Sequence, residues 1–221
     1  MDVFERLKEA AADEWAAYVG HPFVEGLGSG DLDEAAFKHY LVQDYLFLIQ
    51  FARAYALAAY KATSLEDLRA ATAGLSAIVE TEMDLHVRIS ARWGLTRADL
   101  ESAEEARATV AYTRFVLDTG QRGDLLDLYT ALAPCMIGYA EIGAALSQVP
   151  GALGSANPYR EWVAEYSGEA FQAAAADARA TLDRLAQERL TEARWAALAG
   201  IFRQATRLEA DFWDMGITLA Q

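Results

Sequence analysis

Asp44, Glu82, Cys135 and Glu209 are reactive side chains that interrupt otherwise apolar patterns. Each is separated by three or four residues from a series of apolar positions, and this spacing places residues on one face of an α-helix. His86 follows Glu82 by four residues and shares its face. The pattern predicts four helices that direct ionisable groups toward the core. The apolar positions on these faces are Phe37, Leu41, Leu48, Phe51 and Tyr55 around Asp44; Leu75, Val79, Ile89 and Trp93 around Glu82; Leu128, Leu132, Tyr139, Ile142 and Leu146 around Cys135; and Trp195, Leu198, Phe202, Ala205, Phe212 and Gly216 around Glu209.

These inward-facing groups have two interpretations. Burial penalises an ionised carboxylate, so its pKa rises unless a partner compensates. Asp44, Glu82 and Glu209 therefore form either a structural network with tyrosine hydroxyls or the lining of a pocket that performs acid–base chemistry. Cys135 is either a small core residue or a nucleophile. Only the coincidence of the whole set favours the functional interpretation.

Glu82 and His86 also raise the question of a metal site. A carboxylate and an imidazole one turn apart can ligate iron or manganese in a helical bundle, but a dinuclear centre usually takes a second such pair from another helix. The only histidines are His21, His39 and His86, so the later helices supply none. A haem would also need an axial histidine, for which His21 is the only candidate in the first helix. We therefore expect neither a metal nor a cofactor.

Helices account for the whole chain in this interpretation, because no two-residue alternation typical of strands appears. Asp31 is expected to cap the second helix, with Glu34 completing a capping box, after a loop through Gly26, Gly28 and Gly30. Pro134 removes one intrahelical hydrogen bond and predicts a kink just before Cys135. The expected helices span about 3–19, 31–61, 64–94, a short segment from 96, a fifth that ends at 120–123, 124–148, 159–166, 168–189 and 192–219.

Composition narrows the class of protein further. The 221 residues are 53% hydrophobic and 24% charged, which suits one globular domain over residues 1–221. A net charge of −14 repels nucleic acids and anionic membranes and favours a small neutral or cationic ligand. No signal sequence or long uninterrupted apolar stretch is recognisable, and Cys135 is the only cysteine, so we expect a cytoplasmic protein that neither enters a membrane nor binds nucleic acid.

Several segments in order along the chain resemble the thiaminase II (TenA) family, in its cysteine-containing form. The ordered set with the Pro-Cys step is specific and covers nearly the whole chain. The segments are Tyr40-Leu41-Val42-Gln43-Asp44-Tyr45-Leu46-Phe47, Glu82-Met83-Asp84-Leu85-His86, Ala133-Pro134-Cys135, Tyr139-Ala140-Glu141, Tyr159-Arg160-Glu161-Trp162 leading to Tyr166, and Glu209 before Phe212-Trp213.

The resemblance implies an all-α, haem-oxygenase-like helical bundle that binds no haem and assembles as a homotetramer. It also implies hydrolysis of 4-amino-5-aminomethyl-2-methylpyrimidine to the 5-hydroxymethyl compound in thiamin salvage, with slower cleavage of thiamin. In this mechanism Cys135 adds to the pyrimidine at C6, Glu209 donates and accepts protons, and Asp44 binds the 4-amino group. Aromatic walls for the ring come from Phe47, Tyr112, Tyr139 and Tyr166. Glu82, His86 and Glu141 receive no catalytic role.

The chain departs from the family pattern at two places. Phe47 stands where many relatives carry Tyr, and Met136-Ile137-Gly138 is less aromatic than the same step commonly is. A missing hydroxyl would change substrate recognition rather than the class of reaction. Two other functions stay open at this stage: a metal-dependent oxidase on the same bundle, and a regulatory or ligand-binding protein without catalysis.

Overall fold

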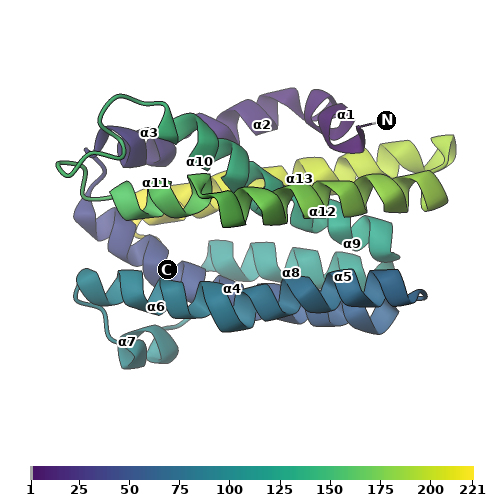
Figure 1. Cartoon of the computed structure of the whole chain (residues 1–221), viewed down its shortest axis with the longest axis horizontal. Helices are drawn as coiled ribbons and strands as arrows, with labels where there is room; N and C mark the ends of the chain where they lie inside the picture. The colour runs from purple at the N-terminus through teal and green to yellow at the C-terminus, as the bar shows by residue number, and fades with distance from the viewer. Residues whose placement is uncertain (1) are drawn as a thin grey trace.

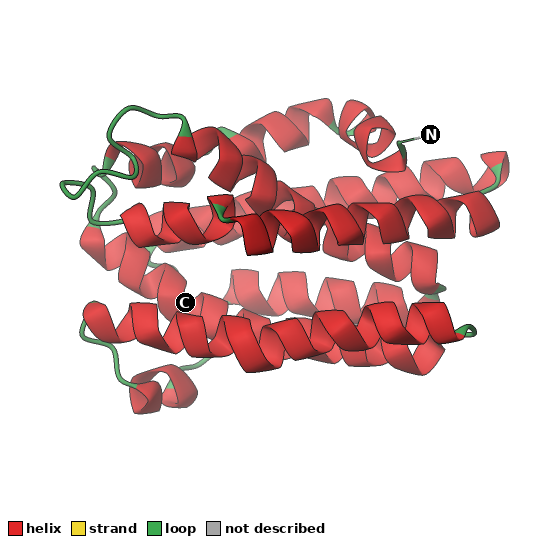
Figure 2. Cartoon of the chain, in the orientation of Figure 1, coloured by secondary structure: helices red, strands yellow, loops and turns green. Residues whose placement is uncertain are grey.

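Helices form most of residues 2–221, the part of the chain that the computed structural model describes, and no strand occurs among them (Figures 1 and 2). The all-α prediction is therefore confirmed. The helices are α1 (Val3–Ala10), α2 (Ala12–Val19), α3 (Pro22–Ser29), α4 (Glu34–Lys61), α5 (Leu65–Ser76), α6 (Met83–Arg92), α7 (Arg97–Ser102), α8 (Arg107–Arg122), α9 (Leu125–Ala133), α10 (Tyr139–Ser147), α11 (Arg160–Ser167), α12 (Glu169–Arg189) and α13 (Glu192–Thr218), with π-helical turns η1 (Ala77–Glu82) and η2 (Pro134–Gly138).

The long helices α4 and α13 organise the bundle. α4 packs against α5, α6, α8 and α13, while α13 also packs against α2, α8 and α9. Figure 1 shows α4, α5, α6 and α8 running along one side of the molecule, with α12 and α13 along the other. The largest fully buried side chains, among them Tyr18, Tyr40, Tyr112, Trp162 and Trp213, come from both sides, so one aromatic-rich core joins them.

The N-terminal segment before α4 differs from the expected helices in two respects. A single helix over residues 3–19 was wrong, because the chain breaks at Ala11, whose φ is −127°. The loop expected through Gly26 and Gly28 is instead α3, which begins with Pro22 at its first position after a His21 cap and ends at Gly30 in the left-handed conformation. A Cβ at Gly28 would lie 2.8 Å from Leu146 Cδ2, so close packing compensates for the low helix propensity of this glycine.

Polar caps fix several other helix ends. Asp33, not Asp31, caps α4, and its Oδ1 accepts a hydrogen bond from the Ala35 amide at 2.7 Å. Asp31 comes directly after the turn that ends α3, so the chain has not yet reached the start of α4. The predicted start at Thr96 is confirmed, since Thr96 and Asp99 form a reciprocal capping box at α7.

Both π-helical turns interrupt longer helices. η2 begins at Pro134, where the sequence predicted a kink, and η1 joins α5 to α6 in the segment expected to be one helix. An extra residue in a turn changes which side chains face the core. Val79 is 54% exposed, so its predicted inward position was wrong, and its neighbour Ile78 is buried in its place.

The continuous helical stretch Leu125–Ser147 is long and apolar enough to cross a bilayer by length and composition. However, 78% of its most apolar window is buried inside the bundle, which is typical of a core helix. It crosses the interior and carries Cys135 near its middle.

Candidate functional site

Asp44 lies on the buried face of α4 and is held by two neighbours. The Tyr40 hydroxyl donates to Asp44 Oδ2 at 3.2 Å, and His86 Nδ1 lies 3.4 Å from the same oxygen. His86 Nε2 lies 2.6 Å from the Leu41 carbonyl oxygen, which can only accept, so Nε2 carries a hydrogen. Burial raises the pKa of Asp44, and His86 and Tyr40 offset part of that rise.

Glu209 lies on the inward face of α13, as Asp44 does on α4, and is 2% exposed. The Tyr112 hydroxyl from α8 donates to Glu209 Oε1 at 2.7 Å. Burial raises the pKa of Glu209 to about 8, the hydrogen bond from Tyr112 lowers it, and the negative charge of Asp44 raises it. Glu209 can therefore gain and lose a proton near neutral pH.

Cys135 lies in η2, between α9 and α10, and is half-buried although its neighbours Pro134 and Ile137 are buried. Burial raises the pKa of its thiol well above the usual value, and the charges of Glu209, Glu82 and Asp44 raise it further. The resting thiol is therefore protonated. A base must accept its proton before the sulfur can act as a nucleophile.

The packing around η2 depends on a glycine and a tyrosine that were not among the predicted site residues. The Tyr18 hydroxyl donates to the Pro134 carbonyl at 3.2 Å. A Cβ at Gly138 would lie only 2.7 Å from Tyr18 Cε1, so this position needs the absence of a side chain. Tyr18 is fully buried against Trp213, at 6.2 Å between ring centroids, and it holds the turn that carries Cys135.

The four predicted aromatic residues form two pairs. Phe47 and Tyr112 contact each other with ring centroids 5.1 Å apart, on the side of Glu209. Tyr139 and Tyr166 lie 5.0 Å apart, on α10 and α11. A Cβ at Gly143 would lie 2.4 Å from the Tyr166 carbonyl carbon, so this glycine allows α11 to approach α10 closely.

Electrostatic interactions connect the two aromatic pairs with the acids and the thiol of the candidate site. Burial raises the pKa of Tyr166 well above its usual value, and nearby Tyr40, Asp44, Glu82 and Cys135 contribute to the rise. Burial similarly raises the pKa of Tyr112, with contributions from Glu209 and Cys135. The predicted acids, thiol and aromatic residues are therefore electrostatic neighbours.

The three residues without a predicted role have different surroundings. Both carboxyl oxygens of Glu141 accept from Lys8 Nζ, at 2.9 and 2.8 Å, so Glu141 ties α10 to α1. His86 orients Asp44 as described above. Glu82 ends η1, is half-buried, and has a pKa raised to about 8 by burial and by the charges of Asp44 and Glu165.

Metal-ligand geometry is not assembled in this cluster. Within residues 2–221 no group of three or more His, Cys, Asp or Glu side chains is arranged to hold a metal ion. Two surface hollows, of about 280 and 510 Å³, lie beside Trp195 and Ile217, and none of the predicted site residues lines either one.

Comparison with known proteins gives consistent matches over nearly the full length. The model of the TENA/THI-4/PQQC family matches residues 9–219. An aminopyrimidine aminohydrolase of Halalkalibacterium halodurans is 40% identical over 210 residues, which cover 95% of this chain and 92% of that protein. These matches agree in extent with the predicted resemblance.

Two solved structures define the architecture. A protein of Silicibacter sp., described as a TenA family transcription regulator, superposes with a TM-score of 0.93 and 42% identity, covering 97% of this chain and 96% of its own. A domain of unknown function from Shewanella denitrificans, described as having a heme oxygenase-like fold, superposes with a TM-score of 0.77 at 14% identity, covering 99% of this chain and 93% of its own. The bundle is therefore haem-oxygenase-like, as predicted.

Proposed function

The chain belongs to the TENA/THI-4/PQQC family, and on this premise we propose that Cys135 is the nucleophile of an aminopyrimidine hydrolase. The enzyme is a hydrolase that acts on a carbon–nitrogen bond in thiamin salvage. Its substrate is 4-amino-5-aminomethyl-2-methylpyrimidine, which it converts to the 5-hydroxymethyl compound, and it cleaves thiamin more slowly. The observation that supports this proposal is that one half-buried thiol lies within electrostatic range of three carboxyl groups from separate elements.

The first step forms a bond between the Cys135 sulfur and C6 of the ring. Glu209 accepts the thiol proton and delivers a proton to a ring nitrogen, so the adduct gains no net charge. A carboxyl group with a pKa of about 8 suits both transfers near neutral pH. The Tyr112 hydrogen bond holds the Glu209 carboxyl in one orientation during the exchange.

The second step breaks the bond between the 5-methylene carbon and nitrogen. The ring electrons, increased by the adduct, move toward C5, and the departing nitrogen takes the bonding pair. Water then adds to the methylene carbon and loses a proton. Elimination of the thiol with loss of the ring proton restores the aromatic pyrimidine and free Cys135.

The remaining predicted residues bind and orient the ring in this proposal. Asp44, fixed by Tyr40 and His86, accepts hydrogen bonds from the 4-amino group. Phe47 with Tyr112 and Tyr139 with Tyr166 provide the aromatic surfaces on which a flat heterocycle packs. Holding the reacting carbon beside the sulfur lowers the entropic part of the barrier.

Assembly and location also belong to the proposal. The family resemblance supports a homotetramer, and exposed Tyr60, Leu65 and Val79 give α4, α5 and η1 apolar surface suited to self-association. A cytoplasmic location agrees with the salvage role. The net charge of −14 supports the enzyme over a DNA-binding regulator, because acidic surfaces repel phosphate backbones.

Replacement of the thiol tests the mechanism directly. We expect Cys135→Ser to lower turnover of the aminomethylpyrimidine by about 10³-fold or more, since a hydroxyl is a far weaker nucleophile in this surrounding. Product formation is followed by chromatography and ammonia release. Circular dichroism and calorimetric binding of the hydroxymethyl product serve as controls for folding and for an intact site. Turnover within tenfold of the unaltered enzyme would exclude Cys135 as the nucleophile.

A further inference from the structure

Glu82 is the site carboxyl that the proposed mechanism leaves unused. It lies at the end of η1, and Cys135 lies within η2, so each of the two π-helical turns in residues 2–221 carries a reactive group of the same cluster. π-helical turns frequently occur at functional sites because they change the direction of a side chain within a helix. The charge of Glu82 acts on Cys135, Tyr55 and Tyr166, which belong to three other elements.

The three carboxyls near the thiol differ in their hydrogen-bond partners. Asp44 is engaged by Tyr40 and His86, and Glu209 by Tyr112. Among residues 2–221 no hydrogen bond or ion pair reaches the Glu82 carboxyl, and its side chain keeps accessible surface. The charged groups that act on it, Asp44 and Glu165, are both acidic. Glu82 is therefore the carboxyl with free oxygens for a ligand.

We infer that Glu82 binds the 5-aminomethyl nitrogen of the substrate and supplies the proton with which that nitrogen departs. The inference rests on the proposed function, because it assigns a further catalytic residue to the same reaction. A cationic ammonium group would give Glu82 the hydrogen-bond donor and the positive charge that its protein surroundings lack.

The proton balance fits an acid of this kind. Neutral Glu82 transfers its proton to the amine, and the resulting carboxylate faces an ammonium group. When the carbon–nitrogen bond breaks, nitrogen takes the electron pair and leaves as ammonia. The water that adds to the methylene carbon then returns a proton to the Glu82 carboxylate. A pKa of about 8 leaves Glu82 mostly protonated at neutral pH before the substrate binds.

Thiamin as a substrate distinguishes the proposed role of Glu82 from the roles of the other site residues. Its leaving group is a thiazolium nitrogen that already carries a positive charge and departs as neutral thiazole without a proton. An acid for the leaving group is therefore needed for the aminomethyl substrate and is dispensable for thiamin. Glu209, which serves the ring, is needed for both.

The test compares both substrates in Glu82→Gln and in the matched variant Glu165→Gln, which removes a neighbouring half-buried acid. We expect Glu82→Gln to lower kcat/KM for the aminomethylpyrimidine by about 10²-fold and for thiamin by less than about threefold. Glu165→Gln is expected to change both by less than about threefold, since it removes a nearby charge but no group that contacts the substrate in the proposal.

Equal losses on the two substrates in Glu82→Gln, or no loss on either, would overturn the inference. If circular dichroism shows that Glu82→Gln does not fold, Glu82→Asp is used to test the inference. This variant keeps an acid at a shorter reach and should reduce only the reaction of the aminomethylpyrimidine. Failure of the proposed function is a separate result, in which Cys135→Ser retains turnover or the unaltered enzyme acts on neither substrate.

Discussion

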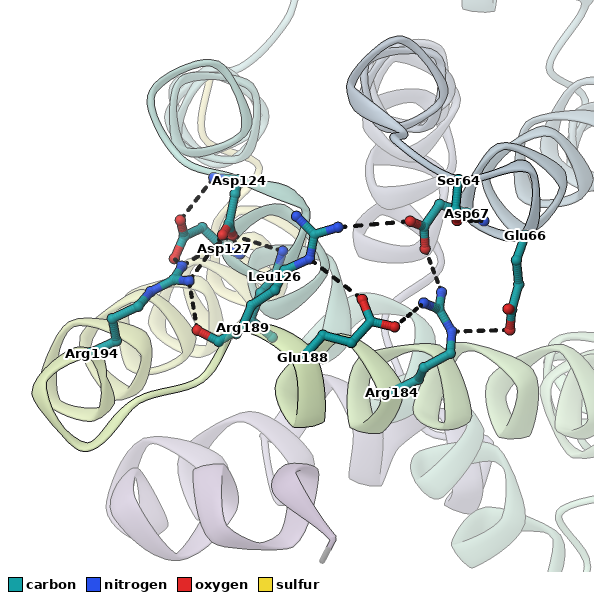
Figure 3. A network of polar contacts seen from close by, with 10 residues as sticks. All are labelled: Ser64, Glu66, Asp67, Asp124, Leu126, Asp127, Arg184, Glu188, Arg189 and Arg194. Atoms are coloured by element: carbon teal, nitrogen blue, oxygen red, sulfur yellow. Dashed lines mark hydrogen bonds and ion pairs between the residues drawn. The ribbon is translucent and has the colours of Figure 1, made fainter.

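Two groups of carboxyls in this bundle have opposite pKa shifts. In the ion-pair network that joins α5 to α12 and the start of α9 to α13, each buried or half-buried aspartate has an arginine (Figure 3). Burial alone would raise the pKa of Asp67, but hydrogen bonds from Arg184 and Ser64 bring it below the usual value. Arg194 does the same for Asp124. These acids stay ionised and connect helices that are distant in the sequence.

The acids of the candidate site have no such partner. No lysine or arginine pairs with Asp44, Glu82 or Glu209 in residues 2–221, and burial raises the pKa of all three. Because most buried acids are paired, an unpaired group costs stability and usually indicates function. The comparison shows that burial alone does not define this site. The absence of a paired lysine or arginine among residues 2–221 distinguishes these acids from those of the network.

The largest expected effect is on catalysis, from Glu209→Gln. Gln has the same shape and can still accept the Tyr112 hydrogen bond, but it cannot transfer protons. We expect kcat to fall by about 10²- to 10⁴-fold on both the aminomethylpyrimidine and thiamin. Steady-state kinetics measure this loss, and product binding by calorimetry checks the site. A loss below tenfold would assign proton transfer to another group.

The same variant should change stability in a direction set by the raised pKa. In the native state the pKa of Glu209 is about 8, whereas an ordinary glutamic acid has a pKa of 4.5. The stability contributed by this group is therefore fully present below pH 4.5 and is lost as the pH rises through 8. Relative to the unaltered protein, Glu209→Gln should gain thermal stability between these pH values, by about 1.4 kcal/mol for each pH unit at most. A constant difference across pH would contradict the raised pKa.

A smaller effect is expected in the network, from Arg184→Met. Asp67 is 4% exposed and loses its principal partner, so we expect the free energy of unfolding in urea to fall by about 1–3 kcal/mol at pH 7. Because the pKa of Asp67 is lowered from its ordinary value of 3.8, this loss should be full above that value and should disappear as the pH falls through the lowered pKa, where the acid becomes protonated in both variants.

The matched control for that variant is Arg122→Met. Arg122 pairs with Asp118 one turn away, and the two side chains are 73% and 58% exposed. Such exposed pairs contribute little, so the expected loss is below about 0.5 kcal/mol. Similar losses in the two variants would mean that the network is no stronger than an ordinary surface pair.

Local patterns in the sequence predicted most helices and the inward faces that carry Asp44, Cys135 and Glu209. Asp44 and Glu209 lie on α4 and α13, which follow the α-helical period, whereas Cys135 lies in the π-helical turn η2 and is half-buried. The predicted inward position of Val79 was wrong because η1 adds a residue to one turn, and no local sequence pattern indicates that change. The predicted cap of α4 at Asp31 was wrong because α3 extends through glycines that tertiary packing accommodates, so α4 begins later, after Asp33.

The contacts that complete the site could not be predicted in the same way. The bond from Tyr18 to the Pro134 carbonyl joins residues 116 positions apart, and Gly143 is defined by its distance from α11. The distinction between Asp67, which has an arginine, and Glu82, which has none, also depends on long-range packing. Periodicity identifies which side chains face inward, while the partner that each one meets depends on the assembled fold.

The smallest expected effect is on substrate preference, from Phe47→Tyr. Phe47 packs against Tyr112 and Phe212, with ring centroids 5.1 and 5.7 Å away, so a hydroxyl added here enters the aromatic wall. We expect the ratio of kcat/KM for the aminomethylpyrimidine to that for thiamin to change by about three- to tenfold, since one polar contact in such a wall discriminates modestly. Phe51→Tyr, one turn along α4 and 5.3 Å from Phe47, makes the same chemical change away from Tyr112. An equal change in both variants would mean that the added hydroxyl acts through packing. A change confined to Phe47→Tyr would make this position a determinant of substrate choice, within a site whose acids stay unchanged.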